Sequence, residues 1–407
     1  MREIRALPAA AFAALALLVP ITSAASAPGG FSEDEMKLAA GLLARHGVVV
    51  LAETTPEGGP KAMTLAVLVN APREEVFKVF ENPENFSFLS SLFKENKVED
   101  SHGSSKAWTW ASRHKLFSFT GTNTISLFPP RRVDIQIVNS TIGSGTFRFD
   151  LRESGKDRTL LVLSGILGVK SSDWIIRYLL GGNPAMQQAM NVAIGIVVVK
   201  GAKDMAERMV RGKPLGKRRV AGPAGGETRP CPAQELVALA PLLARGMVVL
   251  VDENKGGRLR QITAVESVAA PAARVLAAVS TPELYPKMVK AISDVKVGSK
   301  TDEATEFSWT LGFSVFNLSS RNRMTRTPDG VAIDGLDGDF AGARWRWQLA
   351  GADAGHTIVA YHGFVNIDAT TYVLKMSLKR EPYLEHGIMA GSNMVMLRAV
   401  RRAVEAR

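Results

Sequence analysis

Residues that commonly carry chemistry are sparse in this chain of 407 residues. Its six histidines show no ligand spacing with cysteines or acids, and the single cysteine, Cys231, lies between prolines in a setting that does not suit a catalytic thiol. An acidic run at 334–339 does not match a calcium loop and favours a hairpin turn. The sequence also lacks a Gly-x-Ser-x-Gly elbow, a phosphate loop and a dinucleotide fingerprint. It therefore indicates no catalytic residue, no metal site and no cofactor.

Aromatic residues instead alternate with small or charged residues in several strand-like runs. Trp108 and Trp110 flank Thr109, and Phe147 and Phe149 flank Arg148. Because successive side chains of a strand point to opposite faces, this alternation predicts sheets with one aromatic, concave face. These residues either line a cavity for an apolar ligand or fill an ordinary core. The candidate cavity-wall residues are Trp108, Trp110, Phe117, Phe147, Phe149, Trp309, Trp345, Trp347, Tyr361 and His362.

His362 is the best polar candidate of this set. It follows Tyr361 in the last predicted strand of the second half of the chain, and its counterpart in the first half is Ser164. If the imidazole points inward, the two pockets differ. The alternative is a histidine that is exposed or satisfied by hydrogen bonds, and we do not expect a general base at this position.

In each half, one further segment lies between the last predicted strand and the long helix, at 174–180 in the first half and at 372–376 in the second. They combine Trp, Tyr and Ile with Lys170 and Arg177, a composition that suits a membrane interface with rings at the level of the headgroups. The alternative is a short helix packed on its own domain. The candidates for membrane contact or gating are Trp174, Ile175, Tyr178 and Tyr372.

The elements that must position these residues occur twice. The 28-residue stretch 71–98 aligns without a gap with 270–297, and both copies share Ala-Pro at the start and Pro-Glu in the middle. The offset between the copies is 200 at Leu42 and Leu242 and 198 at Gly165 and Gly363. A register that drifts so little predicts one fold repeated in tandem.

Each copy reads as a helix, two strands, two short helices, an antiparallel meander and a long helix. The long helices begin at Pro184 and Pro382, contain no other proline and end in basic residues, as helix C-termini favour. The predicted class is α+β, with two tandem domains at 31–210 and 231–407.

Residues 1–25 resemble a secretory signal, with Arg2 and Arg5 before an apolar run and small residues before Ser26. An uncleaved anchor is the alternative. We therefore expect an exported, periplasmic or secreted protein. The stretch 211–230 reads as a basic linker rich in Pro and Gly, which contributes to the net charge of +11. Such a tract suits transient contact with anionic lipid or is simply solvated; we expect no nucleic-acid partner, and the oligomeric state stays open.

The second copy contains Pro282-Glu283-Leu284-Tyr285-Pro286-Lys287-Met288-Val289, followed by Val295-Lys296-Val297. This segment resembles the START-like superfamily, also called SRPBCC, which includes polyketide cyclases and coenzyme Q-binding proteins. The first copy departs from it, with Phe86-Ser87 in place of Tyr285-Pro286. The resemblance implies a helix-grip fold, in which a curved antiparallel sheet wraps a long C-terminal helix around a cavity that commonly holds an apolar ligand.

Three functional hypotheses follow. The first is an exported, non-enzymatic protein that holds or carries a lipid or another hydrophobic small molecule between sheet and C-terminal helix. The second is an enzyme of the cyclase or aromatase kind, which would need two ionisable side chains within hydrogen-bond reach inside a cavity. The third is an interaction module with a filled core. In that case the final strands at 160–163 and 358–361, which are apolar on both faces, would pack outward against something such as the sister domain.

Overall fold

The computed structural model describes residues 29–406 except 57, 91, 92, 94, 114–117, 170–183, 216–224, 314, 315, 352, 354, 367–380 and 382. The predicted signal at 1–25 lies outside the described residues. So do Phe117 and the candidates for membrane contact, Trp174, Ile175, Tyr178 and Tyr372.

Both halves are built from the same series of elements, as the duplication predicts, and the α+β class is confirmed. The first half contains α2 (Glu33–Leu42), β1 (Val48–Thr54), β2 (Pro60–Val69), α3 (Arg73–Glu81), η1 (Pro83–Asn85), α4 (Phe86–Leu89), β3 (Glu95–His102), β4 (Ser105–Arg113), β5 (Ser118–Phe128), β6 (Arg132–Ser140), β7 (Gly143–Glu153), β8 (Thr159–Val169) and α6 (Pro184–Val210). The second half contains α7 (Ala233–Ala238), α8 (Ala240–Leu243), β9 (Gly246–Glu253), β10 (Leu259–Val268), α9 (Ala272–Val279), η3 (Pro282–Leu284), α10 (Tyr285–Met288), β11 (Ile292–Lys300), β12 (Ala304–Phe313), β13 (Phe316–Thr327), β14 (Gly330–Gly338), β15 (Arg344–Gly351), β16 (Thr357–Phe364) and α12 (Leu384–Glu405).

Local chemistry explains where the helices begin. At α2, the Ser32 hydroxyl accepts a hydrogen bond from the Glu35 N–H, and the Glu35 carboxylate accepts one from the Ser32 N–H at 2.7 Å. Pro184 opens α6, where a missing N–H costs nothing. Among the described helices, α6 alone is long and apolar enough to cross a membrane, yet 72% of its apolar window is buried, as expected of a core helix.

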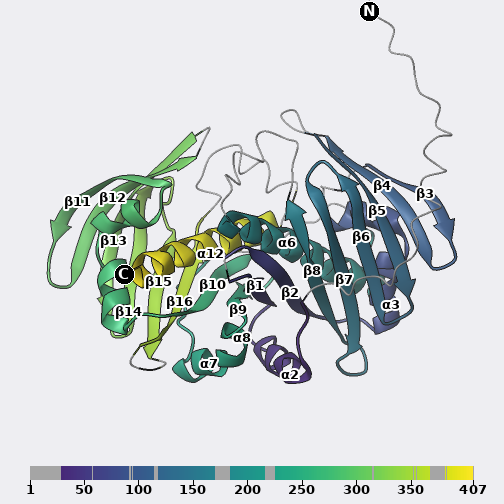
Figure 1. The fold of residues 1–407 in the computed structure, drawn as a ribbon, viewed down its shortest axis with the longest axis horizontal. Helices are drawn as coiled ribbons and strands as arrows, with labels where there is room; N and C mark the ends of the chain where they lie inside the picture. The colour runs from purple at the N-terminus through teal and green to yellow at the C-terminus, as the bar shows by residue number, and fades with distance from the viewer. Residues whose placement is uncertain are drawn as a thin grey trace, which may run out of the picture.

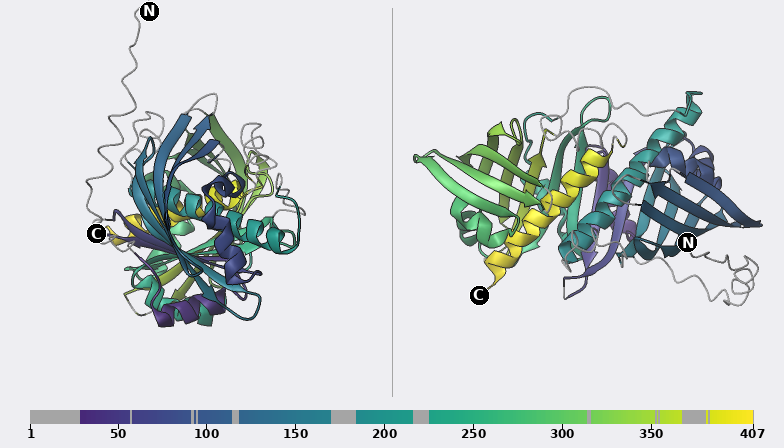
Figure 2. Two further views of the ribbon diagram at one scale, coloured as in Figure 1. Left: turned by 90° about the vertical axis from the view of Figure 1, so that its right-hand side faces the viewer. Right: turned by 90° about the horizontal axis from the view of Figure 1, so that it is seen from above.

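Within the described residues, all strands form one continuous antiparallel sheet of 16 strands. Its order is β11-β12-β13-β14-β15-β16-β10-β9-β1-β2-β8-β7-β6-β5-β4-β3. In the first half the sheet curves around α6, which packs on β2 and β8; in the second half it curves around α12, which packs on β10 and β16 (Figure 1). This is the helix-grip arrangement, present twice. Seen from above, α6 and α12 lie side by side at the centre of the molecule (Figure 2).

The two halves are joined by a seam, the pairing of β1 with β9. Val48 pairs with Val251, and Leu51 pairs with Val248. With the repeat offset of 200, each of these pairs is the image of the other, so the seam has the self-complementary geometry of a two-fold dimer interface.

Reciprocal ion pairs flank this seam. Arg45 of the first half pairs with Glu235 of the second, and Arg245 of the second half pairs with Glu35 of the first at 2.5 Å. Arg245 also reaches Glu53 in β1 at 3.0 Å. Because Glu35, Glu53 and Glu235 are all buried, these pairs fix the relative position of the halves more strongly than exposed pairs would.

A third carboxylate, Glu253 at the end of β9, holds both long helices. Its Oε1 lies 2.5 Å from Lys200 Nζ on α6 and 2.9 Å from His386 Nε2 on α12. Burial raises the pKa of Glu253, but the hydrogen bond from His386 and the charge of Lys200 outweigh it and lower the pKa to about 2. Glu253 is therefore ionised at neutral pH and ties the two helices to the seam.

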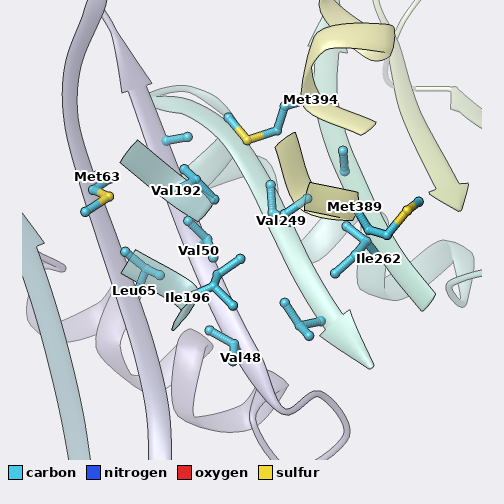
Figure 3. Packing of buried hydrophobic residues seen from close by; sticks show 14 of the residues in the cluster. Val48, Val50, Met63, Leu65, Val192, Ile196, Val249, Ile262, Met389 and Met394 are labelled. Atoms are coloured by element: carbon cyan, nitrogen blue, oxygen red, sulfur yellow. The ribbon is translucent and has the colours of Figure 1, made fainter. Parts of the chain in front are cut away.

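Two apolar cores lie on opposite faces of the sheet. The larger one fills both grips and runs without interruption across the seam, where β1, β9 and both long helices meet (Figure 3). The second core lies on the outer face, beneath α2, α7 and α8. It contains Leu160 and Val162 of β8 and Ile358 and Ala360 of β16, so the outward apolar faces of these final strands are covered by both halves together.

Candidate functional site

The first half encloses an apolar cavity of about 80 Å³ between the curved sheet and α6. Of the described residues that line it, only Asn123 and Ser140 are polar, and none is ionisable. The lining residues are Met63, Phe86, Phe93, Trp108, Trp110, Asn123, Ile135, Ile137, Ser140, Ile142, Phe147, Phe149, Leu163, Leu167, Ile194, Gly195 and Val198.

Strand alternation places the aromatic part of this wall. In β4, Trp108 and Trp110 both point inward; in β7, Phe147 and Phe149 do the same. The Trp108 ring packs against Phe86 of α4 at a centroid distance of 4.6 Å. The duplicated stretch therefore closes one end of the cavity through α4, as its position before the meander indicates.

The rim of the cavity is also apolar. Ile137, Phe147 and Ile194 line the cavity but are only half-buried, and so is Ile142 in the turn after β6. Next to them, Val138 has 56% of its surface exposed. The cavity therefore opens to the surface through a ring of aliphatic and aromatic side chains.

A second hollow, of about 700 Å³, lies over the ends of β3 to β6. Its lining is mostly polar and includes Glu95, Lys97 and Asn139, which are exposed, and Thr109 and Thr122, which are half-buried. Although it is larger, we assign the candidate site to the apolar cavity, because a shallow polar surface gives a small molecule little burial.

The second half carries larger side chains at some of the positions that line the first cavity and smaller ones at others, such as Phe307 for Trp108 and Ile292 for Phe93. Trp345 corresponds to Phe147, Trp347 to Phe149, and Tyr361 to Leu163. The repeat offset of 198 also places Asn393 of α12 where α6 has Gly195. These four residues add side-chain atoms to the interior of the second grip.

Direct contacts hold these larger rings together. Trp347 stacks on Tyr361 at 4.1 Å between centroids, and its indole N–H donates to the Tyr285 hydroxyl at 3.1 Å. Tyr285 in turn donates to the Val279 carbonyl at 2.9 Å, and burial raises its pKa. Trp309 packs edge-on against Trp345 at 5.8 Å. The predicted aromatic residues of this half thus lie inside the grip but contact one another.

His362 lies on the opposite face of β16 from Tyr361, which corrects the expectation that it lines a cavity. Its Nδ1 is 2.8 Å from the Thr263 hydroxyl and its Nε2 is 3.0 Å from Gln348 Oε1, both on the outer face of the sheet. Strand parity sends the two neighbours to different cores, so a strand cannot place both Tyr361 and His362 in one pocket.

The protonation state of His362 follows from its partners. The Gln348 amide accepts from the Cys231 N–H and donates to the Cys231 carbonyl, so its oxygen must face the imidazole. The proton therefore sits on Nε2, and Nδ1 accepts from Thr263. Burial, helped by the charge of Arg346, lowers the pKa of His362 to about 4, and the ring is neutral at pH 7.

Several lining residues are absent from the set predicted from the sequence. Asn123 belongs to the inward-facing row of β5 that includes Ile125 and Leu127, and strand parity could have identified it. Ile194 and Gly195 of α6 carried no such signal, because the helix is apolar nearly all round.

No curated protein matches this sequence. The family model described as polyketide cyclase / dehydrase and lipid transport matches residues 268–381, from the end of β10 to just before α12.

Similar solved structures include proteins of one and of two domains. The di-domain ARO/CYC StfQ from the steffimycin biosynthetic pathway is 13% identical, with 84% of this chain and 98% of that chain covered and a TM-score of 0.30. A STAR-related lipid transfer protein (fragment 25–204) from Xanthomonas axonopodis is 15% identical, covering 39% of this chain and 93% of that chain, with a TM-score of 0.31. The Zhui aromatase/cyclase from Streptomyces sp. R1128 is 19% identical, covering 35% and 95%, with a TM-score of 0.28.

The internal duplication, the sheet curved around each long helix and the family match in the second half agree with one another. The chain therefore has two tandem helix-grip units, and the second of them carries the polyketide cyclase / dehydrase and lipid transport match.

Proposed function

We propose that this chain is a binding protein that holds a lipid or another hydrophobic small molecule in the cavity of its first unit. The observation that carries the proposal is the composition of the wall, which is apolar except for Asn123 and Ser140. Burying apolar ligand surface there is favourable by about 25 cal/mol per Å². The family description, which names lipid transport, matches the second unit, and the first unit has the same series of elements.

The size of the cavity limits how a ligand sits in it. A volume of about 80 Å³ is below the roughly 300 Å³ at which pockets for drug-sized ligands begin. A lipid-sized molecule therefore enters by displacing the half-buried side chains at the rim, Phe147 and Ile194, or inserts only one end. The apolar rim also suits ligand transfer from a membrane surface, which we propose together with export as the setting for this activity.

An enzyme of the cyclase or aromatase kind is less well supported. Acid–base chemistry needs ionisable groups beside the substrate, and among the described lining residues there are none. We therefore propose that the first unit holds its ligand without converting it. The second unit, with its interlocked aromatic rings, is proposed to be a structural partner in place of a second binding site.

The test is an organic extract of the purified protein analysed by mass spectrometry, followed by titration with a fluorescent lipid. We expect a retained hydrophobic compound and saturation near one ligand per chain. The substitution Phe147→Trp copies the second unit and should weaken binding about tenfold or more, since overpacking costs about 1–3 kcal/mol.

The matched control is Trp345→Phe, the reverse change at the equivalent position of the second unit. It should leave the fluorescent-lipid affinity of the protein unchanged. Empty extracts together with no lipid binding would contradict the proposal, and equal effects of the two variants would contradict the assignment to the first unit.

A further inference from the structure

Asn123 places a single amide against the apolar wall of the cavity. It lies in β5 between Trp108 and Ile137 on the neighbouring strands, and only 3% of its surface is exposed. Its Oδ1 is 3.3 Å from Trp110 Nε1. Because the indole N–H can only donate, the acceptor must be the amide oxygen, and this fixes the orientation of the side chain. The Nδ2 group is therefore turned away from Trp110.

That Nδ2 group has no hydrogen-bond partner within the described part of the chain. Nδ2 is not one of the fully buried unpaired atoms of the described residues, so it keeps some accessible surface, and Asn123 lies in the wall of the cavity. A donor in an apolar wall gains free energy when it finds an acceptor. The other polar lining residue does not share this property. The Ser140 hydroxyl donates to the Gly143 carbonyl at 2.6 Å and accepts from the Ile142 and Gly143 N–H groups at 3.2 and 3.0 Å.

The second unit shows how the equivalent amide is satisfied by hydrogen bonds within the protein. There Trp309 donates to the Ser320 hydroxyl at 3.0 Å, and this hydroxyl donates to Asn322 Oδ1, also at 3.0 Å. Asn322 Nδ2 then donates back to the Ser320 carbonyl at 3.4 Å. Asn322 is the counterpart of Asn123. Both units therefore have a tryptophan and an asparagine at these positions, but only in the second does the asparagine Nδ2 donate to an acceptor within the described part of the chain.

The difference arises at Gly121, the counterpart of Ser320. Both residues pair across the sheet with the tryptophan of the preceding strand. At Gly121 the Trp110 ring lies so close that an added Cβ would be 2.6 Å from it. The glycine therefore lets Trp110 lie flat on the strand and reach Asn123 directly, and the Asn123 N–H groups are left for another acceptor.

We propose that Asn123 Nδ2 donates a hydrogen bond to a neutral acceptor oxygen of the bound molecule. The ligand is then a hydrophobic compound that carries a carbonyl, ester or ether oxygen within its buried part. A plain hydrocarbon cannot use the amide, and no cation among the described lining residues would compensate an anionic group. This inference rests on the proposed function of the first-unit cavity.

The test uses two probes of nearly equal size, acetophenone and ethylbenzene, which differ by the carbonyl oxygen. Their dissociation constants are measured by calorimetry on the full chain and on Asn123→Leu. The ratio of the two dissociation constants removes any general change in the hydrophobicity of the cavity between the wild type and the variant. We expect Asn123→Leu to shift this ratio about fivefold against acetophenone, the usual effect of one neutral hydrogen bond. Asn322→Leu in the second unit is the matched control and should leave the ratio as in the wild type.

Infrared spectroscopy gives a measurement that does not depend on the variant folding. The carbonyl stretch of acetophenone bound to the wild-type protein should lie at lower frequency than in an alkane solvent, as hydrogen bonding requires. An alkane-like frequency, or an unchanged ratio in Asn123→Leu when both probes bind, overturns the role of Asn123 while the cavity remains a binding site. If neither probe nor a fluorescent lipid binds the wild type, the proposed function fails, and this inference fails with it.

Discussion

At the scale of single residues, neighbours in the sequence have very different environments. Tyr361 stacks inside the second grip, whereas His362 is hydrogen-bonded in the outer core. The aromatic alternation was sufficient to predict which rings point inward, because it depends only on strand parity. It could not show where a cavity is left open, since rings contact one another in both halves and the open volume depends on how all the side chains of a grip pack together.

The low pKa of His362 predicts how stability depends on pH. The unfolded chain binds this proton near pH 6.5, whereas the folded protein binds it only near pH 4, so protonation favours unfolding. The free energy of unfolding should therefore fall between about pH 6.5 and about pH 4, with a contribution of about 3 kcal/mol from this group. His362→Gln should lack that contribution, which denaturant titrations across the window would measure.

His356→Gln is the control for this experiment, because the His356 side chain is 54% exposed. Its unfolding free energy should still decline between about pH 6.5 and about pH 4, because His362 is unchanged in this variant. A His362→Gln protein whose stability declines as steeply as the wild type between pH 6.5 and 4 would show that this histidine is not held neutral.

At the scale of elements, the contact between α6 and α12 depends on small residues. A Cβ added at Gly387 would lie 2.9 Å from the Ala193 carbonyl oxygen, whereas one added at Gly391 would meet Ala189 at an ordinary 3.4 Å. Two glycines one helical turn apart thus face the same partner helix with different clearance.

These glycines provide a matched pair of substitutions. Gly391→Ala should stabilise the protein by up to about 1 kcal/mol, the gain in helix propensity over glycine. Gly387→Ala should destabilise it by about 1–2 kcal/mol, because the backbone of α6 has to shift. Thermal and denaturant unfolding would measure both. Equal stabilisation by the two alanines would mean that the helices separate easily at this contact.

Most elements were predictable from the sequence because their signals are local. The Ser32–Glu35 capping box, the prolines that open the helices and the repeat register all act within a few residues or between aligned copies. The seam was not predictable. The sequences of β1 and β9 are continuous apolar runs, which predict strands buried on both faces. Such a run does not indicate which other strand it pairs with.

At the scale of the whole molecule, the seam makes one body of the two units. Strand pairing, two reciprocal ion pairs, the Glu253 cluster and an uninterrupted core all cross it. We therefore expect the units to unfold together.

Cutting the chain in the linker tests this expectation. A protease site inserted within 211–230 and cleaved after purification should leave the two pieces associated in size-exclusion chromatography. The unfolding midpoint of the cut protein should then rise with protein concentration, whereas that of the intact chain should not. Pieces that elute separately would show that the linker, and not the seam, holds the units together.

The symmetric seam also affects which amino-acid substitutions the protein can accumulate during evolution. In a dimer of identical subunits, every substitution appears on both sides of the two-fold axis, so a wall cannot be enlarged or filled in one half alone. Once both halves are encoded in tandem, each copy mutates by itself while the seam keeps them in place. Phe149 and Trp347, or Gly121 and Ser320, are differences of this kind. A tandem duplication thus allows the side chains inside the two grips to differ while the seam between them is kept.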